Sequence, residues 1–402
     1  MGKYKTLAIN FGIVVVVLGL IACVFEAVLK LTKFNVPANT RFVTGKGMTY
    51  IPHAYYRHTK EGFSEGYFNS HGFRDYERTI NKPVGVFRIL VLGDSYTEAL
   101  QVKLEESFTA LLEKALNEQA SATRFEVLAL GQSGFGTADE YLRYLNFGLH
   151  YDPDLVIVAF FTGNDFRNNS RFLNRETVGF YYQFDEKREL ALDRSLVDSY
   201  EESLTPPKRV LNELIAKSHL LSLISERIYL LKRQLLQAGA ADVNRGSGGD
   251  NRAKKLDLFS DLNIYQSDPT QQWKEAIEIT EGVILKFRET VESNGSRFLL
   301  LGLSNAEQVH PQMGEELKNK YEVELDYEQP DRMLEEFAKA KGVMFLKLMP
   351  AFRDHHTRTG QYLHGFGSSH GGHWNQAGHR LAAELLLQFL KDQHLVPLKR
   401  TV

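Results

Sequence analysis

The stretch FRILVLGDSYTEALQV at residues 87–102 is an apolar run that stops abruptly on small and polar residues. The run predicts a buried strand, and Gly93, Asp94 and Ser95 follow it directly. Because Gly, Asp and Ser all favour turns, the cluster fits an ordinary turn at the end of a strand. It also fits a strand that ends here in order to present the Ser95 hydroxyl.

Similar apolar, β-branched runs recur along the chain, with helical patterns between several of them. The predicted strands are 86–92, 125–130, 154–161, 297–303 and 343–348, and the predicted helices include 106–118, 138–149 and 331–341. Short apolar strands that alternate with helices indicate a parallel sheet covered on both faces. The sequence therefore predicts a doubly wound α/β domain, whose ligands are expected beyond the carboxyl ends of the strands.

Residues able to do chemistry follow three of these strands and precede the last helix. Ser95 follows the first strand, Gly134 the second and Asn164 the third, and His373 stands in HGGHWNQAGH at 370–379. A serine hydroxyl becomes a nucleophile when a base takes its proton, and histidine suits that task near neutral pH. The backbone N–H of Gly134 and the amide of Asn164 could stabilise an oxyanion. Together these groups indicate acyl transfer at Ser95.

The four blocks, in this order, resemble the SGNH (GDSL-type) hydrolase superfamily. The matching motifs are GDSY at 93–96, SGFGT at 133–137, GND at 163–165 and HWNQAGH at 373–379, and NSHGFRD at 69–75 resembles the lead-in of membrane-anchored bacterial members. The resemblance implies a three-layer α/β/α sandwich with a flavodoxin-like parallel sheet. It also implies Ser95 as nucleophile, His373 as base, and the Ser95 and Gly134 amides with Asn164 as oxyanion hole.

The acidic residue of this family is missing from its expected place. Members usually carry an aspartate two or three residues before the histidine, and those positions hold Gly371 and His370 here. In a full triad that carboxylate fixes the histidine tautomer. The nearest preceding carboxylate, Asp354, lies nineteen residues upstream of His373, and no sequence pattern indicates that it lies at the site. We therefore expect a Ser95–His373 dyad whose ring is oriented by a backbone carbonyl.

The N-terminus predicts a membrane anchor. Residues 6–25 (TLAINFGIVVVVLGLIACVF) carry no charge, and 20 residues are about the length that crosses ~30 Å of hydrocarbon. Two alternatives stay open. LIAC at 20–23 is similar to a bacterial lipoprotein cleavage box with Cys23 as the lipid site, and a shorter apolar core ending in small residues is typical of a signal peptide. Lysines lie on both sides of the run, so the distribution of positive charge says little about which end of the helix lies inside. We expect a single pass through the cytoplasmic membrane, with the catalytic domain outside.

The expected organisation is an anchor at 1–33, an irregular lead-in at 34–85 and a hydrolase-like domain at 86–398. Residues 170–290 separate the third and fourth strands by more than one helix needs and predict a helical insertion. Apolar residues at helical spacing from Val210 to Leu231 fit a helix packed on the domain, a cap over the site, or a surface element beside the membrane. NRGSGGDNR at 244–252 predicts a loop.

The composition argues against several classes of protein. Lys+Arg at 48 against Asp+Glu at 50 gives a formal charge of −2, so nucleic acid is not an expected partner. Cys23 is the only cysteine, which excludes an intrachain disulfide and a cysteine metal site. Six late histidines lack carboxylates or cysteines at ligand spacing, so zinc is the weaker interpretation and no metal or cofactor is expected. They are His355, His356, His364, His370, His373 and His379.

The sequence thus predicts a membrane-anchored serine esterase that acts on the O-acyl, above all O-acetyl, esters of a small molecule or glycan. Only the resemblance to this superfamily suggests that the substrate is a carbohydrate. An O-acetyltransferase of a surface polysaccharide is the alternative on the same chemistry. A non-catalytic carbohydrate-binding or assembly protein on the same fold is the rival from another class, motivated by the missing aspartate.

Overall fold

The computed structural model describes the chain except for residues 1, 121, 177, 245–255, 322 and 399–402. The chain divides into two compact units, Met1–Arg41 with Glu201–Asn251, and Phe42–Tyr200 with Arg252–Val402. This division differs from the boundaries expected from the sequence. Most of the expected lead-in belongs to the second unit, and part of the expected insertion belongs with the N-terminal helix. Residues 245–252 of the predicted loop lie outside the described residues.

The second unit is built on a five-stranded parallel sheet, as predicted. Its strands, in spatial order, are β11 (Phe345–Lys347), β10 (Arg297–Leu303), β7 (Leu155–Phe161), β5 (Val86–Gly93) and β6 (Arg124–Ala129). The chain leaves β5 on one side to form β6 and returns to the other side of β5 to form β7. Ligands of doubly wound sheets bind where the strand order reverses in this way, beyond the carboxyl ends of the strands.

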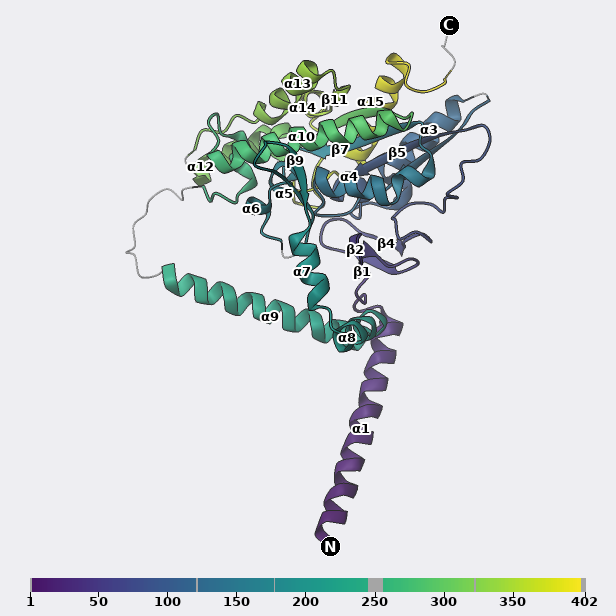
Figure 1. Ribbon diagram of the computed structural model, residues 1–402, viewed down its shortest axis with the longest axis vertical. Helices are drawn as coiled ribbons and strands as arrows, with labels where there is room; N and C mark the ends of the chain where they lie inside the picture. The colour runs from purple at the N-terminus through teal and green to yellow at the C-terminus, as the bar shows by residue number, and fades with distance from the viewer. Residues whose placement is uncertain (1, 121, 177, 245–255, 322, 399–402) are drawn as a thin grey trace. The chain divides into compact units, whose positions relative to one another are not determined.

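Helices cover both faces of this sheet (Figure 1), because successive strand side chains point to opposite sides. Leu90 and Leu92 belong to a core shared with α4 (Thr137–Asn146), α10 (Gln271–Ser293) and α13 (Gln329–Lys341). Ile89 and Val91 belong to a second core, shared with α3 (Phe108–Gln119), α14 (Met349–Thr359) and α15 (Gln376–Asp392). The fold is therefore the expected three-layer α/β/α sandwich.

Shorter elements complete the second unit. The lead-in, expected to be irregular, contains β1 (Thr40–Val43), β2 (Gly47–Tyr50), β3 (Tyr55–His58) and β4 (Ser64–Tyr67), paired as β1–β2 and β3–β4. The short helices are α2 (Ser95–Glu98), α5 (Asp165–Asn168), α6 (Arg171–Asn174), α7 (Ser195–Ser203), α11 (Ala306–Val309) and α12 (Pro311–Tyr321). The ribbon β8 (Tyr181–Phe184) and β9 (Leu190–Asp193) and the 3₁₀ turns η1 (Leu104–Glu106), η2 (Gly148–Tyr151) and η3 (Asp261–Tyr265) make up the rest.

The first unit contains three helices, α1 (Gly2–Thr32), α8 (Pro206–Lys217) and α9 (His219–Asn244). Thr6–Thr32 of α1 is long and apolar enough to cross a membrane, and a signal sequence near the N-terminus would share these features. Two prolines, Pro206 and Pro207, begin α8, where a missing backbone N–H costs nothing.

One buried carboxyl group makes the stability of the sheet unit depend on pH. Glu140 on α4 is fully buried, and neither carboxyl oxygen has a hydrogen-bond partner among the described residues. Burial, and then the charge of Asp94, raise the pKa of Glu140 well above its usual value of about 4.5. The folded state therefore holds a proton that the unfolded state releases as the pH rises above that value. Stability should fall across this window, by up to about 1.4 kcal/mol per pH unit.

Glu140→Gln removes this titration. Its free energy of unfolding should consequently decline less than that of the parent protein between about pH 5 and about pH 8. Urea denaturation curves at the two pH values measure the difference. Parallel declines in the two proteins would contradict the argument.

Candidate active site

Ser95 begins α2 immediately beyond β5, at the sheet edge predicted from the sequence. The Asp94 side chain caps the helix by accepting a 2.9 Å hydrogen bond from the backbone N–H of Tyr96. A Cβ on Gly93 would lie 2.2 Å from Thr97 Oγ1 and 3.1 Å from Ala159 Cβ, so only glycine fits at this sharp turn. The Ser95 side chain is thereby fixed at the end of β5, and it remains partly exposed.

His373 lies against Ser95, although 278 positions separate the two residues. The distance from His373 Nε2 to Ser95 Oγ is 2.8 Å, and the ring of Tyr96 lies 4.9 Å from the imidazole between centroids. The backbone of this segment is held as well, because the Tyr96 hydroxyl donates to the carbonyl of Gly372 at 3.2 Å. The structure thus brings the predicted serine and histidine within hydrogen-bonding distance.

The other ring nitrogen of His373 faces a carboxylate, which corrects the expected dyad. His373 Nδ1 lies 2.7 Å from Glu61 Oε2, and the backbone N–H of His373 donates to the same oxygen at 3.1 Å. No backbone carbonyl takes this place, and Asp354 is an exposed residue of α14 that pairs with Arg358 at 2.8 Å. The hydrogen bond from His373 is the main cause that lowers the pKa of Glu61 below its usual value. Glu61 is therefore ionised at neutral pH and can stabilise an imidazolium.

Glu61 comes from the loop between β3 and β4, a segment in which no sequence pattern points to the site. Arg74 holds this hairpin against α2, the helix that begins at Ser95. Its guanidinium donates to the Tyr56 hydroxyl of β3 at 3.0 Å and to the carbonyls of Glu98, Ala99 and Val102 at 2.6–2.8 Å. The Ser64 hydroxyl of β4 also donates to the carbonyl of Leu100. One network of hydrogen bonds thus holds the Glu61 hairpin against α2.

Two further hydrogen bonds join the segments that follow β5, β6 and β7. The backbone N–H of Gln132 donates to the carbonyl of Gly93 at 3.1 Å, and Asn168 Nδ2 donates to the carbonyl of Gly134 at 3.3 Å. Gly134 has a φ of +83°, which suits glycine, and open space lies beside its Cα. Asn164 is the N-cap residue of α5, and the buried Oδ1 of its side chain has no hydrogen-bond partner among the described residues. Both predicted oxyanion residues therefore lie at the same sheet edge as Ser95.

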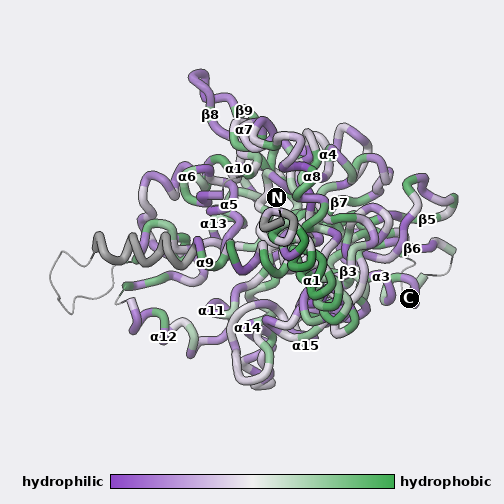
Figure 2. The backbone as a smooth tube through the Cα atoms, turned by 90° about the horizontal axis from the view of Figure 1, so that it is seen from below, coloured by the Kyte–Doolittle hydropathy of each residue, from purple (hydrophilic) through white to green (hydrophobic). Residues whose placement is uncertain are grey.

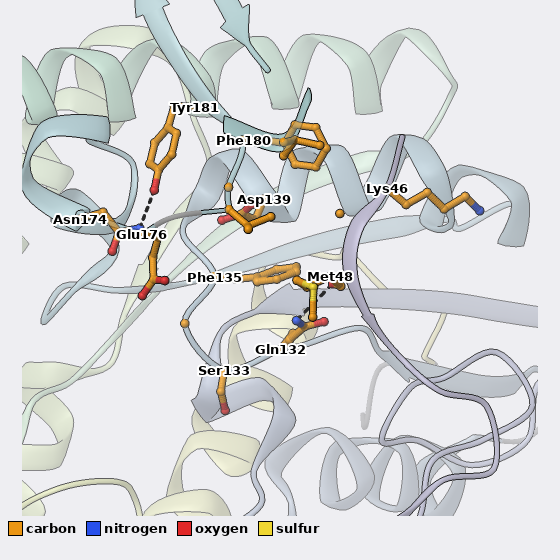
Figure 3. Close-up of a pocket in the computed structure, with 15 residues that line it drawn as sticks. Lys46, Met48, Gln132, Ser133, Phe135, Asp139, Asn174, Glu176, Phe180 and Tyr181 are labelled. Carbon is orange, nitrogen blue, oxygen red and sulfur yellow. Dashed lines mark hydrogen bonds between the residues drawn. The ribbon is translucent and has the colours of Figure 1, made fainter. Parts of the chain in front are cut away.

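A cavity of about 230 Å³ opens beside Ser133 and Gly134 (Figure 3). The aromatic rings of Phe135, Phe180 and Tyr181 and the carboxyl group of Asp139 line it. These residues come from the loop after β6, from α4, and from the segment that leads into β8. The lead-in adds Lys46, whose ammonium group points away from the cavity and lies 4.1 Å from the ring centre of Phe147. Ser95 and His373 do not line this cavity, which begins at Ser133 and Gly134.

The other late histidines have structural partners. His364 and His379 are buried: His364 Nε2 lies 3.0 Å from the carbonyl of Ser304, and the backbone N–H of Phe108 donates to His379 Nδ1 at 3.3 Å. Within the described ranges, no group of three or more His, Cys, Asp or Glu residues is arranged to hold a metal ion.

Comparisons with known proteins found likeness only among solved structures. No family model and no curated protein matches the chain. An acetyl xylan esterase is 12% identical, with a TM-score of 0.40, covering 76% of this chain and 100% of the esterase. An acetylxylan esterase from Geobacillus stearothermophilus, solved as a catalytic mutant, is 12% identical, with a TM-score of 0.38 and coverages of 75% and 93%. A two-domain esterase active on acetylated mannans is 11% identical, with a TM-score of 0.39 and coverages of 78% and 51%.

Proposed function

We propose that this protein is a serine esterase that cleaves O-acyl esters through an acyl-enzyme on Ser95. The observation that carries the proposal is the continuous chain from Ser95 Oγ to His373 Nε2, at 2.8 Å, and from His373 Nδ1 to Glu61 Oε2, at 2.7 Å. This arrangement of nucleophile, base and acid defines the triad by geometry and not by sequence order. The reason for considering a non-catalytic protein was the missing acid, and Glu61 removes that reason.

The reaction follows from the positions of these groups. Ser95 gives its proton to His373 Nε2 as its oxygen attacks the ester carbonyl, and Glu61 stabilises the imidazolium. The negative oxygen of the tetrahedral intermediate accepts hydrogen bonds from the backbone amides of Ser95 and Gly134 and from the Asn164 amide. His373 then protonates the departing alcohol, and a water molecule releases the acyl group from Ser95 by the same route.

We assign the substrate to short acyl esters, with acetyl esters of a glycan as the first candidates. The cavity beside Gly134 is smaller than the ~300–1,000 Å³ typical of pockets for drug-sized ligands, so it suits a small group. Its aromatic rings and polar groups offer stacking faces and hydrogen bonds to a sugar. With α1 in the cytoplasmic membrane, the domain would act at the outer face.

Two assays test this function. A fluorophosphonate probe should label the purified protein at Ser95, and acetate should be released from some member of a panel of acetylated glycans and small acetyl esters. Labelling without acetate release from any of them would contradict an acetyl esterase. Acetyl transfer to an added glycan acceptor, in preference to water, would favour the transferase alternative.

Asn164→Ala should slow turnover by about 10²- to 10³-fold, the usual loss when one oxyanion donor is removed. The Michaelis constant should change little, because the donor acts mainly on charge that develops in the transition state. Steady-state kinetics on a small acetyl ester measure both values. Asn294→Ala, the same change at the exposed end of α10, is the matched control. An unchanged turnover in Asn164→Ala would place the oxyanion hole elsewhere.

A further inference from the structure

The two helices α8 and α9 carry an apolar surface that is left exposed by the described residues of their own unit. On α8, Val210, Leu211 and Leu214 have 51–59% of their surface exposed. On α9, Leu221, Ile224, Ile228 and Leu231 have 37–56% exposed, while Tyr229 and Leu230, 64% and 36% exposed, lie outside this group. Single exposed apolar residues are ordinary, but a run of seven on two consecutive helices indicates a binding surface.

These residues share one side of each helix. The α9 positions 221, 224, 228 and 231 follow the spacing i, i+3, i+7, i+10, which places them within one stripe of the helix. Glu226 lies on the opposite side, while Arg227 and Lys232 lie at the two edges of the stripe. An apolar stripe with basic residues at its borders is typical of helices that lie in a membrane interface, where long basic side chains reach the headgroups.

A carboxylate of α1 fixes where these helices begin. Glu26 accepts hydrogen bonds from the Ser218 hydroxyl at 2.8 Å and from the backbone N–H groups of His219 and Leu220 at 2.9 and 2.8 Å. It thereby caps the N-terminus of α9, which is favourable for a negative charge. Asn35, just beyond α1, donates from Nδ2 to the carbonyl of His219 at 2.8 Å. The junction of α8 and α9 is thus attached to the C-terminal part of α1.

The position of Glu26 along α1 places this junction at a membrane boundary. The uncharged run of 20 residues at 6–25 is about 30 Å long as a helix, which matches the hydrocarbon thickness. Glu26 is the first charged residue after it, so it lies where hydrocarbon gives way to headgroups. Within this unit, α9 runs crosswise to α1 in Figure 1, and Figure 2 shows α1 coloured as mainly hydrophobic.

We propose that α8 and α9 lie in the membrane interface around the outer end of α1 and insert their apolar stripe into the lipid. The occupant of the stripe is then a lipid surface, because the stripe starts beside an apolar helix of membrane-spanning length. Helices α8 and α9 would then attach the chain to the bilayer at a second place. This attachment does not depend on the chemistry at Ser95. The proposal rests on α1 crossing the membrane.

Fluorescence quenching in lipid vesicles tests this placement in the full-length chain. Cys23→Ser removes the only cysteine, and Ile228→Cys then allows an environment-sensitive fluorophore to be attached within the stripe. Glu226→Cys, on the opposite side of the same helix, is the matched control. The proteins are reconstituted in vesicles of phosphatidylethanolamine and phosphatidylglycerol, with and without lipids that carry a quenching doxyl group on the acyl chain. Hydrolysis of a small acetyl ester by each labelled protein checks that the sheet unit is folded.

The label at position 228 should be quenched several-fold more strongly by doxyl lipid than the label at position 226. Equal weak quenching at both positions would overturn the proposal. A blue-shifted label at position 228 that doxyl lipid fails to quench would also overturn it, because the stripe would then be covered by protein. Both results would leave the esterase reaction itself unaffected.

Discussion

Glu61→Gln is expected to lower turnover by about 10⁴-fold while the protein stays folded. In the parent protein, the Glu61 carboxylate accepts the Nδ1 proton of His373 at 2.7 Å and leaves Nε2 free to take the proton of Ser95. An amide can instead donate to Nδ1, which favours the tautomer with its proton on Nε2, and loss of the acid in a serine triad typically costs about this factor. Steady-state kinetics on a small acetyl ester, with circular dichroism as a check on folding, measure the effect.

Two variants make this prediction specific to Glu61. Asp354→Ala removes a carboxylate that is exposed and paired with Arg358, so turnover should stay unchanged. Gly371→Asp places an acid where the SGNH hydrolases that the sequence resembles usually carry one. It should not raise turnover, because Nδ1 of His373 already has Glu61 as its partner. A slow parent enzyme that Gly371→Asp accelerates, together with a neutral Glu61→Gln, would restore the dyad interpretation.

Ser95→Ala is expected to abolish both ester hydrolysis and fluorophosphonate labelling, with a loss of at least about 10⁴-fold in turnover. The substitution removes one oxygen from a partly exposed side chain at the start of α2, so the fold and its melting temperature should change little. Labelling measured by gel fluorescence and turnover measured on a small acetyl ester report the two effects separately.

The matched control for Ser95→Ala is Ser293→Ala, an exposed serine near the end of α10 that should keep full labelling and turnover. Labelling that persists in Ser95→Ala would assign the nucleophile to another residue. Labelling that disappears while ester hydrolysis continues would mean that the probe and the substrate react at different sites.

The sequence by itself determined the sheet and the serine–histidine pair. The five strands could be predicted because buried parallel strands are short and almost wholly apolar. This pattern is visible in the sequence without knowledge of the tertiary contacts. Ser95 was predictable because it directly follows a strand, and the carboxyl end of a parallel strand is where ligands bind. His373 was predictable from its motif ahead of the last helix. Gly134 and Asn164 lie at the expected edge, and their catalytic role stays a prediction until Asn164 is tested.

Only the tertiary structure decided which carboxylate completes the site. Glu61 stands 312 positions from His373, in a hairpin loop with no local pattern that marks it. It reaches the imidazole because Arg74 and Ser64 hold the hairpin against the segment after α2. A carboxylate needs only a short distance and a suitable direction to act on a histidine, and both arise from packing between segments far apart in the chain. Strands are encoded by neighbouring residues, whereas this hydrogen bond is encoded by the fold as a whole.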